Sequence, residues 1–258
     1  MTLTLALDTS TTSVAVALGE IGADGVRLLA ETNIDAPRAA LTHLVPIVMQ
    51  LLESSGHAIG DVGEVVVGRG PGSFTGVRIA VATAKGIAQG LGVPLFGVGT
   101  LDAVAERFAS SETLLGLVGD AMRGEVYPAL FRCAKGDVQR MGPDEVSTAQ
   151  EIARRWAGLG QPLLVAGGGL RKYRDALERE LGAAARFAPE PTWTPTGESL
   201  LLAAWRARVS GTRGDGDPAT LLPVYTRLSD AEEAERVRTG RPATLDGRGV
   251  AGPEEGPS

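Results

Sequence analysis

The sequence predicts an α/β protein built as two lobes. Twice along the 258 residues, an apolar, β-rich start leads into glycine-rich turns and helices, first from residue 3 and again from residue 114. Hydrophobic residues make up 43% of the chain and charged residues 22%, as in globular proteins with a substantial core. Together these observations predict two layered lobes with a cleft between them. The two halves show no detectable sequence repeat.

The first lobe, expected over residues 1–110, opens with a β-hairpin. Its arms are residues 3–7 and 14–18, and its turn is rich in Asp, Thr and Ser. Apolar residues at helical spacing predict a helix over 38–52, which Pro46 should kink or shift. The remaining elements are a strand over 26–31, a strand over 63–67, a helix ending near 91, a strand over 93–98 and a helix over 101–108.

The second, smaller lobe is expected over residues 111–195. Alternating apolar residues predict two paired strands, 114–122 and 125–133. Further elements are a helix over 148–157, a strand over 162–166, a helix ending at 181, and a helix over about 196–208 that packs back on the first lobe. Residues 196–238 form this last helix and an extension. Residues 239–258 are rich in Gly and Pro with little to bury, so we expect that tail to be disordered.

Composition argues against several classes of protein. The formal net charge is −6, whereas a chain that binds nucleic acid by itself normally presents a basic surface. Cys133 is the only cysteine, so no internal disulfide can form and a reducing cytoplasm is expected. The N-terminus lacks the features of a secretory signal, and no apolar run approaches the roughly 20 residues of a membrane helix.

Residues 68–86, GRGPGSFTGVRIAVATAKG, form a donor-rich loop that leads into a helix. Such a loop can bind phosphate at the helix N-terminus. It is not a Walker A loop, because Val77 and Arg78 follow Gly76 where Lys and Ser or Thr are required, and the glycine spacing also misses the dinucleotide fingerprint. A structural turn, with Ser73 as helix N-cap, and an anion site remain open alternatives.

Asp8 ends the first predicted strand and precedes several hydroxyl residues. It could orient magnesium-bound water or phosphate, or it could cap its own hairpin through an Asx-turn. With the glycine-rich loop and a second glycine run it outlines a candidate nucleotide cleft, although no Lys or acid–base pair stands out there. The candidate nucleotide or anion residues are Asp8, Ser10, Gly70, Gly72, Ser73, Thr75, Gly76, Gly167 and Gly168.

The helix behind the loop carries two rows of small residues. One row is Gly76, Ala80, Ala84, Ala88 and Gly92, and the other is Ala82, Gly86 and Gly90. Each interior Gly costs about 1 kcal/mol of helix propensity relative to Ala, so close packing must offset that cost. Packing within the lobe and a contact with another subunit are both open explanations for the small residues. The helix over 38–52 has little polar face, so it is either deeply buried or covered by a partner.

The sequence predicts no catalytic or metal site. His43 and His57 are fourteen residues apart, and the chain contains neither an HxxxH pair nor a cysteine cluster. There is no GxSxG motif for a serine nucleophile, and Cys133 is expected to be a core thiol.

Five segments in this order resemble the bacterial TsaB (YeaZ) family. They are LALDTSTTSVAVAL, APR followed by LVPIV, GRGPGSFTGVRIAVATAKGIAQGLGVPLFGV, DAMRGEVYPALF and PVYTR, and the resemblance covers residues 3–228. It implies the two-lobed ASKHA fold (actin-like and Hsp70-like, related to ribonuclease H), with lobes on a βββαβα plan. It also implies a role in making threonylcarbamoyladenosine in tRNA.

The resemblance implies a non-catalytic subunit that forms a heterodimer with the catalytic subunit TsaD, joined by the ATPase TsaE. Family members lack the metal-binding histidines of TsaD, and Ala39 and Ala40 stand in that region here. The dimerisation surface lies on the first two helices, and the interface candidates by position are Leu41, Leu44, Val45, Val48, Val77, Val81 and Ala84. Met122 departs from the Arg common in relatives, which leaves a polar role of that hairpin open.

The resemblance leaves some alternatives open. We expect no cofactor of the chain's own, beyond weak nucleotide binding or ATP or ADP at the interface of the complex. tRNA is expected to be reached only through the complex, and a homodimer could use the same surface. The competing hypotheses are a self-sufficient ATP-dependent or peptidase-like enzyme and, less favoured by the acidic charge, a tRNA-binding module.

Overall fold

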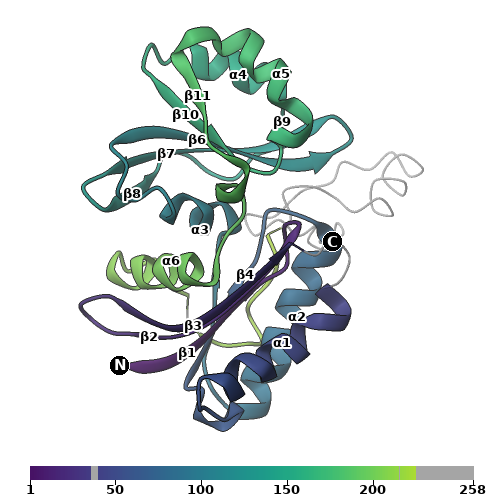
Figure 1. Ribbon diagram of the computed structural model, residues 1–258, viewed down its shortest axis with the longest axis vertical. Coiled ribbons are helices and arrows are strands. Elements are labelled where there is room, and N and C mark those ends of the chain that lie inside the picture. The colour runs from purple at the N-terminus through teal and green to yellow at the C-terminus, as the bar shows by residue number, and fades with distance from the viewer. Residues whose placement is uncertain (36–39, 215, 225–258) are drawn as a thin grey trace, which may run out of the picture.

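The computed structural model describes residues 1–35, 40–214 and 216–224, with only the backbone described at residues 40 and 41. Within these residues the chain forms two β-sheets stacked with helices (Figure 1). The two-sheet α/β fold predicted from the sequence is confirmed. The tail predicted to be disordered, residues 239–258, lies outside the described residues, as do Ala39 and the side chain of Ala40.

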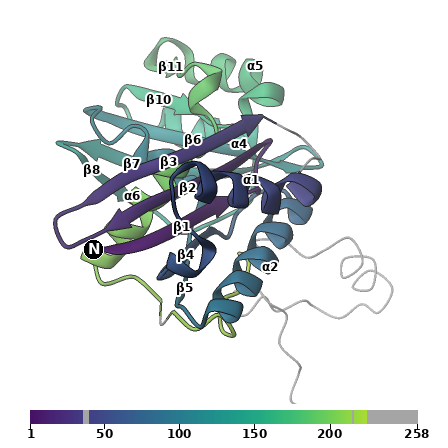
Figure 2. The ribbon, with the colours of Figure 1, turned by 60° about the horizontal axis from the view of Figure 1, so that its bottom comes forward.

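The first sheet has the strand order β3-β2-β1-β4-β5. Its strands are β1 (Thr2–Asp8), β2 (Ser13–Ile21), β3 (Val26–Asp35), β4 (Glu64–Gly68) and β5 (Leu95–Val98). The first three form an antiparallel meander, and β4 and β5 continue the sheet parallel to β1. Two helices, α1 (Ala40–Ser54) and α2 (Phe74–Leu91), lie side by side on one face of this sheet (Figure 2), and a short 3₁₀ turn spans Ile59–Asp61. Pro46 lies within α1, which continues through it.

The second sheet has the order β11-β10-β6-β7-β8. Its strands are β6 (Thr113–Met122), β7 (Glu125–Ala134), β8 (Asp137–Arg140), β10 (Leu163–Ala166) and β11 (Ala185–Phe187), with β9 (Ser147–Thr148) paired to β7. Helices α4 (Ala149–Ala157) and α5 (Leu170–Leu181) pack on its outer face, and 3₁₀ turns span Gly182–Ala184 and Glu190–Thr192. The sequence did not predict β8, β9 and β11, because each has four residues or fewer and too little alternation to be recognised.

Both sheets are built to the same plan. Each begins with a three-strand antiparallel meander, followed by a helix, a strand parallel to the first strand, a second helix and an outer strand. Strand β6 therefore corresponds to β1, β10 to β4, and α5 to α2. This order matches the βββαβα plan that the family resemblance implies.

Two helices lie between the sheets: α3 (Thr100–Glu106) and α6 (Gly197–Val209) (Figure 1). Helix α6 packs on the inner face of the first sheet, and α3 contacts both α6 and the second sheet. The buried Glu106 of α3 pairs with Arg206 of α6 (Nε to Oε1, 2.5 Å), and Asp102 of α3 pairs with Arg140 of β8 (2.9 Å). These ion pairs tie the two lobes together through α3.

The central strands of the first sheet, β2, β1 and β4, are buried on both faces. Leu5 and Leu7 face the core beneath α1 and α2, whereas Ala6 faces the core beneath α6. This explains the nearly continuous apolar run of β1, since a strand covered on both sides needs no alternation. The second lobe has its own core around Phe131 and Trp156.

After α6 the chain returns along the outer edge of the first sheet. Gly216 accepts a hydrogen bond from the amide of Leu95 (2.9 Å), and the amide of Val224 donates to Arg69 (2.8 Å). Arg208 and Arg213 both pair with the buried Glu64 of β4, which fixes this segment to the sheet. In the three described stretches of chain, no helix has the length and apolar character needed to cross a membrane.

Candidate functional site

The glycine-rich loop between β4 and α2 is filled by the turn between β1 and β2. The amide of Ser73 donates to the carbonyl of Ser10 (2.7 Å), and the Thr9 hydroxyl donates to the carbonyl of Gly76 (2.6 Å). A Cβ built at Gly72 or Gly76 would overlap the carbonyl oxygens of Ser10 and Thr9, respectively. The two glycines thus allow the turn to enter the loop. Ser73 is the N-cap of α2, as predicted, because its hydroxyl accepts from the amide of Gly76 (3.3 Å).

Asp8 lies at the centre of a buried hydrogen-bond cluster. Its Oδ1 accepts from the amide (2.6 Å) and the hydroxyl (2.7 Å) of Ser10, and its Oδ2 accepts from the hydroxyl of Thr100 (2.7 Å). The amide of Gly70 donates to the same Thr100 hydroxyl (3.2 Å). The cluster therefore joins the first turn, the loop after β4 and the start of α3. The hydrogen bond that the Ser10 amide donates to Asp8 confirms the Asx-turn interpretation of Asp8.

The electrostatic state of Asp8 follows from its burial. Its carboxylate is fully buried and its hydrogen-bond partners are neutral groups. Burial raises the pKa of Asp8 above its ordinary value, and the hydrogen bonds from Thr100 and Ser10 oppose part of that rise. A Cβ at Gly68 would overlap Asp8 Oδ2, so the neighbouring strand closes the other side of the carboxylate.

This geometry does not fit a magnesium–nucleotide site as it stands. The Asp8 oxygens are engaged within the chain, and the amides of Gly70, Ser73, Gly76 and Val77 all donate to intramolecular acceptors. In the described part of the chain, no group of three His, Cys, Asp or Glu residues could hold a metal ion. Thr75 is exposed in the first turn of α2. Nucleotide or anion binding at this loop stays a prediction, and it would require the Thr9–Ser10 turn to move.

The corresponding junction of the second lobe holds the other predicted glycines. Gly167 and Gly168 connect β10 to α5, and a Cβ at Gly167 would overlap the carbonyl oxygen of Val118, whereas one at Gly168 would meet nothing within 4 Å. Nearby, Lys172 pairs with Asp120 (2.5 Å), and Arg171 donates to the Thr12 hydroxyl of the first lobe (2.8 Å). Here the charged groups lie at the surface instead of inside a cluster.

The two small-residue rows of α2 have different surroundings. Ala80, Ala84 and Ala88 are buried against the first sheet, where α2 contacts β1 and β4. The row that includes Gly86 and Gly90 faces outward, and a Cβ at either glycine would meet nothing within 4 Å. Packing inside the lobe therefore explains the buried residues of the first row, whereas Gly92 is the exposed, left-handed C-cap of α2 and the second row is exposed.

Most of the residues predicted for the interface belong to the chain's own core. These core residues are at most 4% exposed and are Leu44, Val48, Val77, Val81 and Ala84. Their apolar stripe marks the faces that α1 and α2 turn toward their own sheet, so any contact surface on these helices must use other side chains. Val45 is exposed, and the side chain of Leu41 lies outside the described residues.

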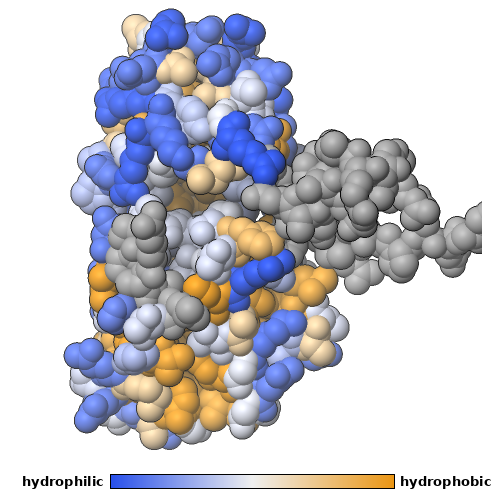
Figure 3. Space-filling model, turned by 90° about the vertical axis from the view of Figure 1, so that its right-hand side faces the viewer, coloured by the Kyte–Doolittle hydropathy of each residue, from blue (hydrophilic) through white to orange (hydrophobic). Residues whose placement is uncertain are grey.

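Other apolar side chains of α1 and α2 are exposed. Val45 is 52% exposed, Met49 49% and Phe74 40%, and the Arg78 guanidinium lies 3.7 Å from the centre of the Phe74 ring. Figure 3 shows apolar surface gathered on this side of the first lobe, below a more hydrophilic second lobe. We call the exposed set Val45, Met49, Phe74, Ala82, Gly86 and Gly90 the α1–α2 face.

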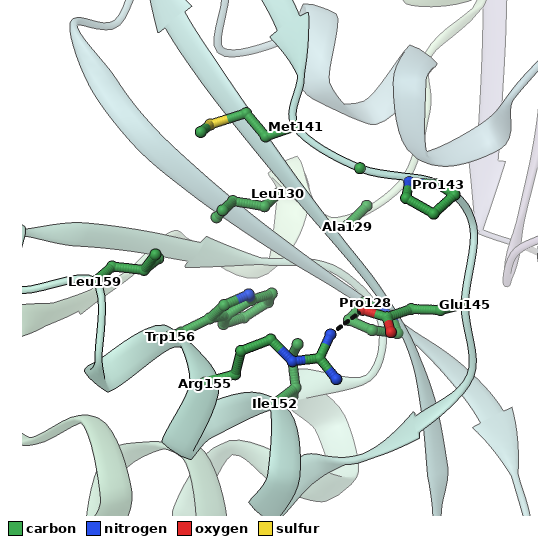
Figure 4. A pocket seen from close by; sticks show the side chains of 11 residues that line it. Pro128, Ala129, Leu130, Met141, Pro143, Glu145, Ile152, Arg155, Trp156 and Leu159 are labelled. Atoms are coloured by element: carbon green, nitrogen blue, oxygen red, sulfur yellow. Dashed lines mark hydrogen bonds and ion pairs between the residues drawn. The ribbon is translucent and has the colours of Figure 1, made fainter.

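A pocket of about 220 Å³ lies in the second lobe between β7, α4 and the segment after β8 (Figure 4). Its walls are mostly apolar, including Leu130, Met141 and Trp156. Arg155 and Glu145 at its edge pair with each other (2.5 Å), and the pocket has no other charged side chain in its lining. It therefore offers no nucleophile or unpaired acid–base group.

The histidines and the cysteine do not form a reactive site. His43 is exposed on α1, and Cys133 is buried in the second core. Burial raises the pKa of the Cys133 thiol to about 11, which keeps the less reactive thiol form at neutral pH. The expectation of a core thiol is confirmed.

Comparisons with known proteins give consistent matches. The family model for "TsaD: tRNA N6-adenosine threonylcarbamoyltransferase" matches residues 34–172. The tRNA threonylcarbamoyladenosine biosynthesis protein TsaB of Escherichia coli (strain K12) is 32% identical over 227 residues, which cover 86% of this chain and 94% of that protein. TsaB of Bacillus subtilis (strain 168) is 28% identical over 228 residues, 88% of this chain and 95% of the relative. The solved structure of YeaZ from Pseudomonas aeruginosa superposes with a TM-score of 0.73 at 29% identity, over 87% of this chain and 100% of that one.

Proposed function

The chain belongs to the TsaB (YeaZ) family, and from this membership we propose that it acts in the biosynthesis of threonylcarbamoyladenosine in tRNA. Within that process we assign it the role of a non-catalytic subunit that pairs with the catalytic subunit TsaD. The names of the curated relatives support the process, and the arrangement of polar groups and exposed surfaces in this chain supports the role.

The observation that carries the proposal is the α1–α2 face. Gly86 and Gly90 each cost about 1 kcal/mol of helix propensity, and among the described residues nothing lies within 4 Å of where their Cβ atoms would be. Val45, Met49 and Phe74 expose apolar surface on the same two helices. Exposed apolar side chains next to a ridge without side chains are suited to close packing against another protein. The family model for TsaD matches residues 34–172, a range that includes both helices. This chain is therefore related to TsaD over these helices, and TsaD is the partner that we propose.

The polar groups at the end of β1 support a non-catalytic role. Asp8, the carboxylate best placed by sequence for nucleotide chemistry, is fully buried and bonded to Ser10 and Thr100. It braces the fold and has no open path to a substrate. We therefore propose that any ATP or ADP binds at the contact with TsaD, and that the ATPase TsaE joins the same assembly.

The net charge of −6 favours contact with tRNA through the partner subunits instead of through this chain alone. The assembly would work in the cytoplasm. A homodimer through the α1–α2 face would occur when TsaD is absent, since both pairings use the same side chains.

The test replaces exposed apolar residues of the face with charge. We expect the double variant Val45→Asp with Met49→Asp to weaken binding to TsaD at least tenfold, because two buried carboxylates would lack partners in the complex. The matched control is Val209→Asp, at the far end of α6, where the side chain is 64% exposed. Binding is measured by isothermal titration calorimetry, and tRNA modification is measured in the reconstituted system.

Three outcomes would contradict the proposal. Unchanged TsaD affinity in the double variant, with an intact fold by circular dichroism, would remove the interface. Micromolar binding of Mg-ATP by the isolated chain, with multiple turnovers, would instead favour a self-sufficient ATP-dependent enzyme. Hydrolysis of peptides by the isolated chain would favour the peptidase-like alternative.

A further inference from the structure

We propose that the pocket between β7 and α4 in the second lobe binds a free α-amino acid with an apolar side chain. The carboxylate and ammonium groups of the ligand would meet the ion pair at one end of the pocket, and its side chain would fill the apolar end. The proposed contact with TsaD uses helices of the first lobe, so this inference goes beyond the proposed function and does not depend on it.

The pocket lies where the edge of the second sheet is interrupted. Strand β9 pairs with β7 at Glu125 and Val126, and β8 pairs with β7 from Phe131 onward, so residues 127–130 of β7 pair with neither strand. The connection between β8 and β9, residues 141–146, curves away from the sheet there (Figure 4). We call this connection the arch. The pocket of about 220 Å³ lies between the arch, β7 and α4.

One end of the pocket is apolar, with Leu130, Met141, Trp156 and Leu159 in its walls (Figure 4). Trp156 is only 4% exposed, and a Cβ at Gly116 would lie 2.7 Å from its ring, so the indole packs directly on the backbone of β6. A cavity of about 150 Å³ can hold benzene. This pocket therefore has room for a single ring or a branched aliphatic side chain.

The other end of the pocket carries one positive and one negative charge. Arg155 of α4 pairs with Glu145 of the arch (Nη1 to Oε1, 2.5 Å), and Figure 4 shows this pair beside Pro128. Within the described residues this is the only hydrogen bond of the Arg155 guanidinium, which has five N–H donors, and Glu145 Oε2 accepts none. The two side chains are 55% and 38% exposed, so their remaining donors and acceptors are accessible to a ligand.

Pro128 adds a hydrogen-bond acceptor at the charged end. The Leu130 carbonyl accepts from the amide of Met141 (2.8 Å), on the edge of β7 that faces away from β6. Alternate residues of an antiparallel strand direct their carbonyls to the same side, so the Pro128 carbonyl faces this edge as well. Proline has no N–H to leave unpaired at such an edge. In the described chain no group donates to this carbonyl at the interrupted edge, so it is open to a ligand.

These groups together match one class of small molecule. A ligand carboxylate can accept from the unused donors of Arg155, and a ligand ammonium can donate to Glu145 and to the Pro128 carbonyl. A ligand with a single charge would meet a like charge as well as an opposite one, whereas a zwitterion complements both. The apolar end then selects a side chain such as that of leucine or phenylalanine, because a charged side chain would be buried there without a partner.

The test follows the tryptophan indole N–H signals of the full chain by nitrogen–proton correlation NMR as L-leucine is added. Of the three tryptophans, Trp156 lines the pocket, whereas the indoles of Trp193 and Trp205 donate to the carbonyls of Ala188 (2.9 Å) and Ala23 (3.3 Å). We expect the Trp156 signal to shift with a Kd of about 1 mM or tighter while the other two stay in place. Trp156→Phe identifies the signal by removing it.

Analogues of leucine separate the contributions of the two ends of the pocket. N-acetyl-L-leucinamide lacks both charges, and 4-methylpentanoate lacks the ammonium group. Each should bind roughly tenfold more weakly than L-leucine, because it loses charge-assisted hydrogen bonds. L-glutamate, which has a charged side chain, should leave the Trp156 signal unchanged.

Variants of the ion pair test the same groups from the side of the protein. Glu145→Gln and Arg155→Met should each weaken L-leucine binding roughly tenfold, and the partial exposure of both side chains makes loss of the fold unlikely to intervene. The matched control is Arg27→Met, which removes the exposed ion pair with Glu20 in the first lobe and should leave binding unchanged.

Three results would overturn the proposal. The first is the absence of a saturable Trp156 shift up to about 20 mM L-leucine. The second is binding of N-acetyl-L-leucinamide as tight as that of L-leucine, because the pocket would then accept apolar groups regardless of charge, as in the docking of a partner's peptide. The third is unchanged L-leucine affinity in both ion-pair variants, with the rest of their NMR spectra preserved.

Discussion

The two strand–loop–helix junctions, β4 to α2 and β10 to α5, occupy the same place in the two sheets but are built differently. The last parallel pairs are Leu7 with Val67 in the first sheet and Leu117 with Ala166 in the second. The next residue of the central strand is Asp8 in one case and Val118 in the other. The first junction is therefore held by a buried carboxylate, and the second has an apolar residue at that point.

The difference shows how one topology serves two purposes. In the first lobe, Asp8, Ser10 and Thr100 direct their hydrogen bonds inward, so the junction braces α3 and the loop before α2. In the second lobe, Asp120 and Lys172 form their ion pair at the surface. Shared topology alone therefore does not predict whether a junction is a binding site or a structural support.

The largest expected effect comes from adding one methyl group at the first junction. Gly76→Ala should destabilise the chain by roughly 3 kcal/mol or more, because the Cβ would overlap the backbone carbonyl of Thr9, which cannot move without shifting the turn. Gly168→Ala, at the second junction, meets open space and should change stability by less than about 1 kcal/mol. Urea unfolding of both variants checks the contrast, and equal losses would show that the junctions are equally tight.

Removing the carboxylate of Asp8 or of Asp120 should give the next largest difference in stability between the two junctions. Asp8→Ala leaves the Ser10 amide and the two hydroxyls without their acceptor, and we expect a loss of about 2 kcal/mol. Asp120→Ala breaks one partly exposed ion pair and an exposed hydrogen bond from the Met122 amide (3.0 Å), and should cost about 1 kcal/mol or less. Chemical denaturation at pH 7 measures both. A larger loss for Asp120→Ala would reverse the assignment of the bracing role.

The pH dependence of stability should differ in sign between the lobes. Because the folded-state pKa of Asp8 is raised above 3.8, wild type should lose stability relative to Asp8→Asn as pH rises from 3.8 through that pKa. Glu151, in the capping box of α4, has its pKa lowered by hydrogen bonds from Thr148. Wild type should therefore lose stability relative to Glu151→Gln as pH falls below about 4.5. Unfolding curves between pH 3 and 8 test both trends, and slopes of the same sign would contradict the opposite directions of the two pKa shifts.

The smallest effect is a gain in stability. Gly86→Ala should stabilise the isolated chain by about 0.5 to 1 kcal/mol, since the exposed position accepts a Cβ and Ala favours the helix. The same substitution at Gly76, in the same helix, is expected to have the opposite sign. A higher melting temperature combined with weaker TsaD binding would identify Gly86 as a contact residue. A lower melting temperature would show that the position is packed in the monomer.

Much of this architecture could be predicted from the sequence. The hairpin, the glycine-rich loop and Ser73 as N-cap follow from local turn and capping chemistry. Helical periodicity identified a buried face on α1 but could not specify what covers it. Leu44 and Val45 are both apolar neighbours, and only the fold shows that Leu44 faces the sheet while Val45 faces outward.

The candidate site was less predictable for a different reason. Asp8 and Gly76 lie in separate segments, and the turn that fills the loop is a tertiary contact, as is the bond from Thr100 to Asp8. A loop that cradles a phosphate and a loop that cradles a peptide turn need the same glycines. The pattern alone therefore leaves both alternatives open.

Helix α6 has a consequence for how the chain is made. The inner face of the first sheet, including Ala6, Ala15 and Val66, is covered by Leu200 and Leu201 near the other end of the sequence. In chain order, the second sheet and its two helices, residues 113–187, are complete before α6, so the first sheet waits longer for the helix that covers its inner face. The sheet that is translated first is thus the one that gains its inner cover last, after residues 197–209 of α6 have been made.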